Sequence, residues 1–70
     1  MMLYYEYINP LIQFGYEQYD LCIFDGGICV ARFTKTFPAG VSEIEMSDYA
    51  ANMMSVTEAA MALSQQEVAP

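Results

Sequence analysis

The sequence contains no histidine, and this absence removes much of the usual catalytic chemistry. Histidine is the commonest general base, the commonest metal ligand and the usual activator of a nucleophilic side chain. Glycine-rich phosphate-binding fingerprints are also missing. The closest pair of carboxylates, Glu43 and Glu45, is expected on a solvated face where nothing would raise a pKa. We therefore expect a protein that is not an enzyme and uses no cofactor.

Cysteine is scarce as well, with Cys22 and Cys29 the only two in the chain. Their spacing matches no known zinc site, and Asp25-Gly26-Gly27 lacks the further acidic ligands of a calcium loop. We expect no bound metal and two cysteines that serve for packing. A cross-strand disulfide is the alternative if the environment is oxidising.

Basic residues number only two, Arg32 and Lys35, against nine carboxylates, and the net charge is −7. Such a chain should repel nucleic acid and anionic membranes and attract basic protein surfaces. Acidity that merely keeps a small domain soluble is the competing explanation. The sequence has no apolar run of about 18 residues and no basic signal-peptide region, so a cytoplasmic location is expected.

Hydrophobic residues are abundant, at 56% of 70 residues. A chain of this size forms one domain and buries only about 60% of the surface that its unfolded form exposes. We expect a single compact domain over residues 1–70, frayed at 67–70. Some apolar surface should remain exposed, which usually indicates a partner or a second copy of the chain.

The local pattern predicts strands over the first half of the chain. Residues 2–8 form a weakly alternating aromatic segment, and Asn9-Pro10 is expected to end it and begin a short helical turn. Segments 19–24 and 28–34 are predicted to form the two strands of a hairpin.

The hairpin turn can be formed in two ways, and the sequence does not decide between them. An Asp25-Gly26 turn would pair Leu21 with Val30 and Cys22 with Cys29. A Gly26-Gly27 turn would instead pair Phe24 with Cys29.

Residues 43–46 fit a third strand because Ile44 and Met46 alternate with Glu43 and Glu45, although Ser42 could also begin a helix there. From Ser47 the apolar spacing changes to three and four, which predicts a helix over 47–66. Its apolar stripe comprises Met46, Tyr49, Met53, Val56, Ala60 and Leu63. The expected fold class is α+β: a small antiparallel sheet of three or four strands packed against one C-terminal amphipathic helix.

A candidate interface follows from this arrangement. If Leu21, Ile23, Ile28 and Val30 meet the helix, the opposite sheet face mixes aromatic and acidic side chains. The N-terminal tyrosines, Tyr7 included, add contact area with a polar end. The predicted partner-binding residues are Asp20, Phe24, Phe33, Glu43, Glu45, Asp48, Tyr4 and Tyr5.

Two functions fit these features. One is an inhibitor, in effect a DNA mimic, whose acidic face occludes a basic nucleic-acid-binding surface of another protein. The alternative is a structural or assembly module that forms a homo-oligomer, for example a homodimer, or seats on a partner subunit.

Three features carry a resemblance: the hairpin 19–34 with its Asp25-Gly26-Gly27 turn, the acidic stretch 43–48 and the helix 47–66. In length, charge and architecture the chain resembles the phage-encoded anti-CRISPR proteins. The resemblance implies binding to a CRISPR effector, such as a Cascade-type complex, in the host cytoplasm. It implies inhibition by blocking DNA entry or nuclease recruitment. Small acidic antitoxins and other phage proteins share the same general features.

Overall fold

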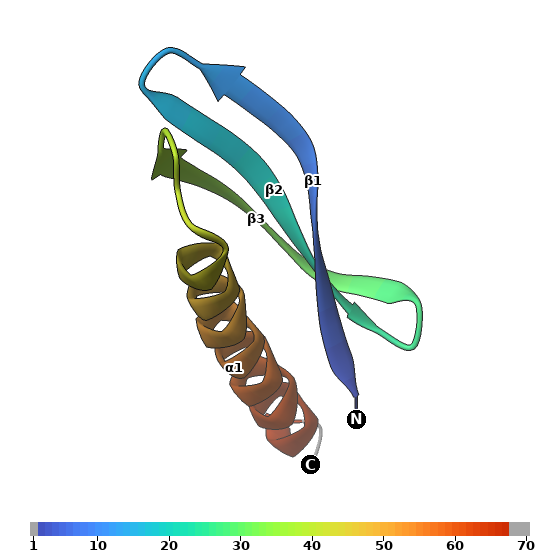
Figure 1. Cartoon of the computed structure of the whole chain (residues 1–70). Coiled ribbons are helices and arrows are strands. Elements are labelled where there is room, and N and C mark those ends of the chain that lie inside the picture. Colours follow the sequence, from blue (N-terminus) through green and yellow to red (C-terminus); the bar gives the residue numbers. More distant parts are fainter. Residues whose placement is uncertain (1, 68–70) are drawn as a thin grey trace.

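The chain forms three antiparallel strands followed by one long helix (Figure 1). The structure is a computed structural model that describes residues 2–67. Its elements are β1 (Leu3–Gln13), β2 (Tyr16–Asp25), β3 (Ile28–Pro38) and α1 (Glu43–Glu67). The strands lie in the order β1-β2-β3, which confirms the α+β class with a three-stranded sheet. The predicted fraying at 67–70 lies outside the described residues apart from Glu67, where α1 ends.

Gly26 and Gly27 form the turn between β2 and β3. Their φ angles of 60° and 90° suit glycine, because a side chain is strained in this region. Phe24 pairs with Cys29, as the Gly26-Gly27 alternative predicted. The pairing of Cys22 with Cys29 is wrong: Cys22 lies opposite Arg32, and both cysteines are free thiols. Burial raises the pKa of the Cys22 thiol.

β1 continues through Asn9-Pro10, where a break and a helical turn were expected. The register with β2 shifts between Ile8 and Leu11, so the strand absorbs an extra residue as a bulge. Asn9 takes a φ of 54°, a conformation that asparagine tolerates better than most residues. Its side-chain amide donates a hydrogen bond to Asp20 on the neighbouring strand.

The helix begins at Glu43, so the third strand predicted over residues 43–46 is wrong. Ser42 provides the reason, because its Oγ accepts a hydrogen bond of 3.1 Å from the Glu45 backbone N–H. Its carbonyl accepts another from Met46. An N-cap serine satisfies N–H groups that the first helical turn would otherwise leave unpaired. Glu43 and Glu45 lie in that first turn, where carboxylates interact favourably with the helix dipole.

The core is small and centres on three fully buried residues: Leu21, Ile23 and Ala50. Ala50 has a small side chain, which lets α1 approach β2 closely. Thr57 is also buried on this helix face, and its hydroxyl donates to the Met53 carbonyl at 2.8 Å. Val56 and Leu63 were expected in the buried stripe but are 56% and 58% exposed, because α1 lies over β1 and β2 and leaves this flank uncovered.

Phe33 packs against the core on the helix side of the sheet, so its predicted place on the outer face is wrong. The Asp25-Gly26 turn would have paired Leu21 with Val30. Leu21 instead pairs with Phe33, so its partner on β3 is displaced by three residues, an odd number. Side chains alternate along a strand, and any odd shift moves them to the other face. Ile28, expected against the helix, instead pairs with Asp25 next to the turn and is 69% exposed.

The molecule is elongated, with principal extents of 52 × 18 × 18 Å, because the strands and the helix run along one axis (Figure 1). Within residues 2–67, no helix combines the length and the apolar character that crossing a membrane requires.

Candidate protein-binding surface

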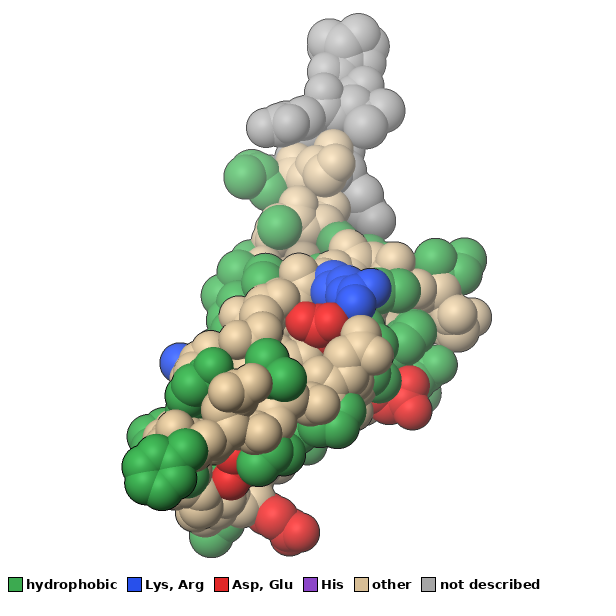
Figure 2. Space-filling view, turned by 90° about the horizontal axis from the view of Figure 1, so that it is seen from above, with side chains coloured by type: hydrophobic (Ala, Val, Ile, Leu, Met, Phe, Trp, Pro, Cys, Tyr) green, Lys and Arg blue, Asp and Glu red, His purple; other side chains and the backbone are tan. Residues whose placement is uncertain are grey.

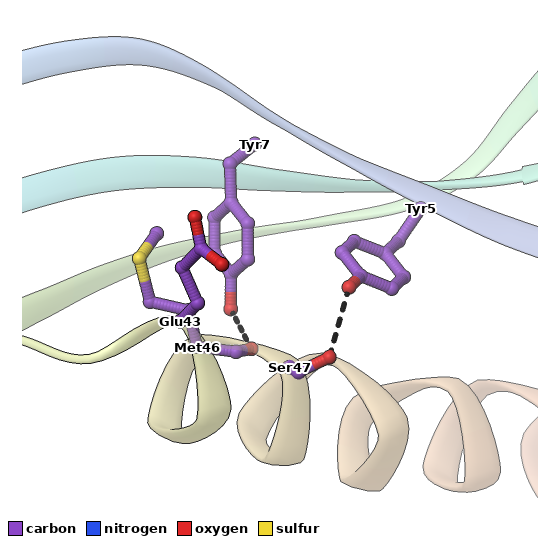
Figure 3. A pocket seen from close by; sticks show the side chains of 5 residues that line it. All are labelled: Tyr5, Tyr7, Glu43, Met46 and Ser47. Atoms are coloured by element: carbon purple, nitrogen blue, oxygen red, sulfur yellow. Dashed lines mark hydrogen bonds between the residues drawn. The ribbon is translucent and has the colours of Figure 1, made fainter.

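A shallow pocket opens where the first turns of α1 lie against β1 (Figure 3). Its volume is about 380 Å³. We call it the acidic pocket, and its lining residues are Tyr5, Tyr7, Glu43, Met46 and Ser47.

Hydrogen bonds between strand and helix hold the walls of the acidic pocket in place. The Tyr7 hydroxyl donates to the Met46 carbonyl at 2.6 Å. The Tyr5 hydroxyl and Ser47 Oγ share a hydrogen bond of 3.2 Å. Alternation along β1 places Tyr5 and Tyr7 on the same face, so both rings reach the helix. The two rings meet edge to face, with their centroids 5.9 Å apart.

Tyr7 is a neutral hydrogen-bond donor at any physiological pH. Burial, together with the neighbouring Tyr5 and Tyr49 hydroxyls, raises the pKa of Tyr7 to about 12. Its ring also contacts Tyr19 and Phe37 edge to face, at centroid distances of 5.7 and 6.1 Å. Tyr7 therefore fixes the back of the pocket.

Glu17 positions the loop that leads into the helix. Its carboxylate accepts hydrogen bonds of 2.8 Å from the Gly40 backbone N–H and from the Tyr19 hydroxyl. These two bonds, the Gly40 bond first, lower the pKa of Glu17. The β3–α1 loop is thereby attached to β2, and the start of α1 is placed over the tyrosines of β1.

Glu43 is the one charged residue among those that line the acidic pocket. Figure 3 shows its side chain rising from α1 beside the ring of Tyr7. The two cations of the described chain lie elsewhere. Arg32 is paired with Asp20, and Lys35 lies 5.0 Å from the centroid of the Tyr49 ring. Glu43 is exposed at the pocket, with no cation of residues 2–67 in an ion pair with it.

The charge extends over the neighbouring helix surface. Glu45 and Asp48 are exposed on the same turns as Glu43. Aromatic walls beside an unpaired carboxylate suit a lysine or arginine side chain, which a ring face and a carboxylate both attract.

The outer face of the sheet presents a different arrangement around Asp20. Its carboxylate accepts hydrogen bonds from Asn9 at 3.0 Å, Arg32 at 2.7 Å and Thr34 at 2.9 Å. These bonds, from Asn9 first and then Arg32 and Thr34, hold the pKa of Asp20 at about 2. Asp20 stays charged, yet Arg32 already compensates that charge. This face therefore offers a partner less free negative charge than the sequence suggested.

Tyr4 and Phe24 stack on each other across β1 and β2. Their ring centroids are 5.2 Å apart and their planes differ by 15°. Tyr4 is 47% exposed, so the stack forms an aromatic patch beyond the Asp20 network.

The eight predicted residues thus occupy three places. Asp20, Phe24 and Tyr4 are on the outer sheet face, Phe33 is on the helix side, and Glu43, Glu45, Asp48 and Tyr5 surround the helix start. Met46 and Ser47 also line the pocket and were not predicted as site residues. The Ser42 capping pattern was the signal that could have placed them there, because it moves the helix start to Glu43.

Among the described residues, no three His, Cys, Asp or Glu side chains are grouped closely enough to hold a metal ion together. We compared the chain with models of protein families, with the sequences of curated proteins and with solved structures, and none matched.

Proposed function

We propose that this chain is a non-catalytic protein-binding domain that accepts a basic side chain of another protein in the acidic pocket. One observation carries the proposal: Glu43 lies beside the rings of Tyr5 and Tyr7 without a cation of the described chain to neutralise it. A lysine or arginine from outside would supply that cation.

The charge of the whole chain supports the same partner chemistry. A net charge of −7 creates a negative field that draws basic surfaces and raises the rate of encounter. Glu45 and Asp48 strengthen this field beside the pocket. The interface we propose therefore lies at the start of α1 and not on the outer face of the sheet.

Inhibition is the biological role that this chemistry suits. A domain that covers basic side chains in a nucleic-acid channel competes with the phosphates that those side chains bind. The CRISPR effector complexes to which the sequence resemblance points contain such channels. We propose occlusion of a channel of this kind as the function.

The test is the binding of a fluorescein-labelled, arginine-rich peptide, followed by anisotropy at low and high salt. Glu43→Gln removes the pocket charge while keeping the side-chain shape. Glu58→Gln is the matched control, because it changes the net charge equally from an exposed position fifteen residues, or about 22 Å, further along α1.

We expect Glu43→Gln to weaken binding about fivefold at low salt, corresponding to about 1 kcal/mol for an exposed charge interaction. The control should stay within about twofold, since it removes only a distant part of the field. Equal weakening of binding by the two variants would show that only the overall charge matters. It would refute the proposal that the acidic pocket is the binding site.

A further inference from the structure

β3 is an outer strand of the sheet, and its far edge is open in the described structure. From Ala31 to Phe37 it pairs with β2 in an unbroken register, and Pro38 comes only at its end. An open edge offers backbone N–H and C=O groups to another strand. The opposite edge, on β1, is interrupted in its middle by Pro10 and the Asn9 bulge. β3 is thus the edge better suited to pairing.

An apolar groove of about 400 Å³ runs beside this edge, between β3 and α1. Its apolar lining includes Val30, Ala31 and Phe33 from β3 and Val56, Ala60 and Met61 from α1. Val30 is 38% exposed and Val56 is 56% exposed. The groove exists because α1 lies over β1 and β2 and leaves the inner face of β3 only partly covered.

Charge makes the β3 edge the best place for two copies to meet. The chain carries a net charge of −7, and two copies repel each other over most of their surface. Residues 26–42 contain no Asp or Glu, and both cations, Arg32 and Lys35, lie on β3. Repulsion between copies is therefore smallest where β3 meets β3.

A single copy exposes more surface than a compact chain of its mass. The accessible surface is 4930 Å². A compact monomer of 7.9 kDa exposes about 4,400 Å². The excess of about 500 Å² comes in part from the elongated shape, and it is smaller than the area of about 800 Å² that each partner buries in a standard interface. Figure 2 shows hydrophobic side chains spread over the face in view, with acidic and basic side chains between them.

We propose that two copies of this chain pair antiparallel through β3, about a two-fold axis perpendicular to the sheet. The product is a continuous six-stranded sheet with both helices on one face, since such an axis does not exchange the faces. The two apolar grooves then meet over the joined β3 strands, and Val56 and Phe33 of both copies become covered. The acidic pockets lie on the β1 side of each helix, so a dimer presents two of them and forms independently of their occupant.

Analytical ultracentrifugation over a wide concentration range tests this dimer. Val56→Glu places a charge in the groove, and Ile44→Glu is the matched control. Ile44 is also an exposed apolar residue of α1, at 73%, but lies outside the groove, and both variants change the net charge equally. We expect a wild-type dimer that Val56→Glu weakens more than about tenfold, because the interface buries the new charge twice. The Ile44→Glu dimer should be weakened far less.

Amide hydrogen exchange of the unmodified protein tests the strand pairing directly and does not depend on how a variant folds. Raising the protein concentration should slow exchange at alternate β3 amides between Ala31 and Phe37, whose N–H groups point away from β2. A protein that is monomeric at every concentration overturns the proposal. A dimer without this protection, or one that both variants dissociate equally, overturns it as well.

Discussion

Replacing Leu21 by alanine is the sharpest test of the packing that holds sheet and helix together. Leu21 is fully buried in the middle of β2, between its pairing partners Tyr7 and Phe33 and in the same cluster as Ala50. Truncating a fully buried leucine removes its transfer free energy and leaves a cavity, at a typical cost of about 3 kcal/mol.

This cost is large relative to the stability of so small a domain. At about 0.05–0.15 kcal/mol per residue, the free energy of unfolding of a 70-residue domain is about 4–10 kcal/mol. Leu21 and Ile23 are the only large side chains that are fully buried in the described structure, so few other contacts can compensate. We expect Leu21→Ala to lower the melting temperature by about 12–24 °C, or to unfold the chain outright.

Urea denaturation followed by circular dichroism measures the effect, at one fixed protein concentration for all variants. Ile12→Ala is the control, because Ile12 lies on β1 of the same sheet but is 64% exposed. Its cost should stay within about 0.5 kcal/mol. A loss below about 1 kcal/mol for Leu21→Ala, or similar losses for both variants, would refute this view of the core.

Two further predictions concern single polar groups. The folded pKa of Asp20, about 2, lies below its ordinary value of 3.8, so the stability that ionised Asp20 contributes is present above pH ~4 and is lost as pH falls toward 2. The gap in urea midpoint between wild type and Asp20→Asn should accordingly narrow over that range, and a constant gap would contradict the network. Ser42→Ala should cost about 1 kcal/mol by removing the cap of α1, whereas Ser42→Asp should retain most of the stability. Equal urea midpoints for wild type and Ser42→Ala would show that the cap is unimportant.

The start of the helix shows how closely balanced local signals can be. Ser42 and Ser47-Asp48 are both good N-cap sequences, and alternation of Ile44 with Glu43 and Glu45 favoured the later start. In the folded chain, Glu17 holds the Gly40 backbone against β2, which places Ser42 where it can cap the helix. A contact between residues 23 positions apart is not visible in a local pattern.

The position of the candidate site also depends on where the helix begins. Tyr5 and Glu43 were both predicted to bind a partner, yet nothing in the sequence indicated that they lie together. They meet because the helix begins at Glu43 and crosses β1 there. Asp20 was predicted as free acidic surface, but pairing of β2 with β3 places Arg32 and Thr34 against its carboxylate.

Local chemistry in the sequence by itself determined the central hairpin and the C-terminal helix, the Gly26-Gly27 turn as one of two alternatives, the apolar excess and the strongly negative charge. These depend on backbone preference, periodicity and composition, which act over a few residues. Tertiary structure alone decided which face the β3 side chains from Ala31 onward occupy, because the register shift at Ile23/Phe24 moves each of them by one position. Side chains on a strand alternate with a period of two, so that one shift placed Phe33 on the helix side of the sheet, packed against the core.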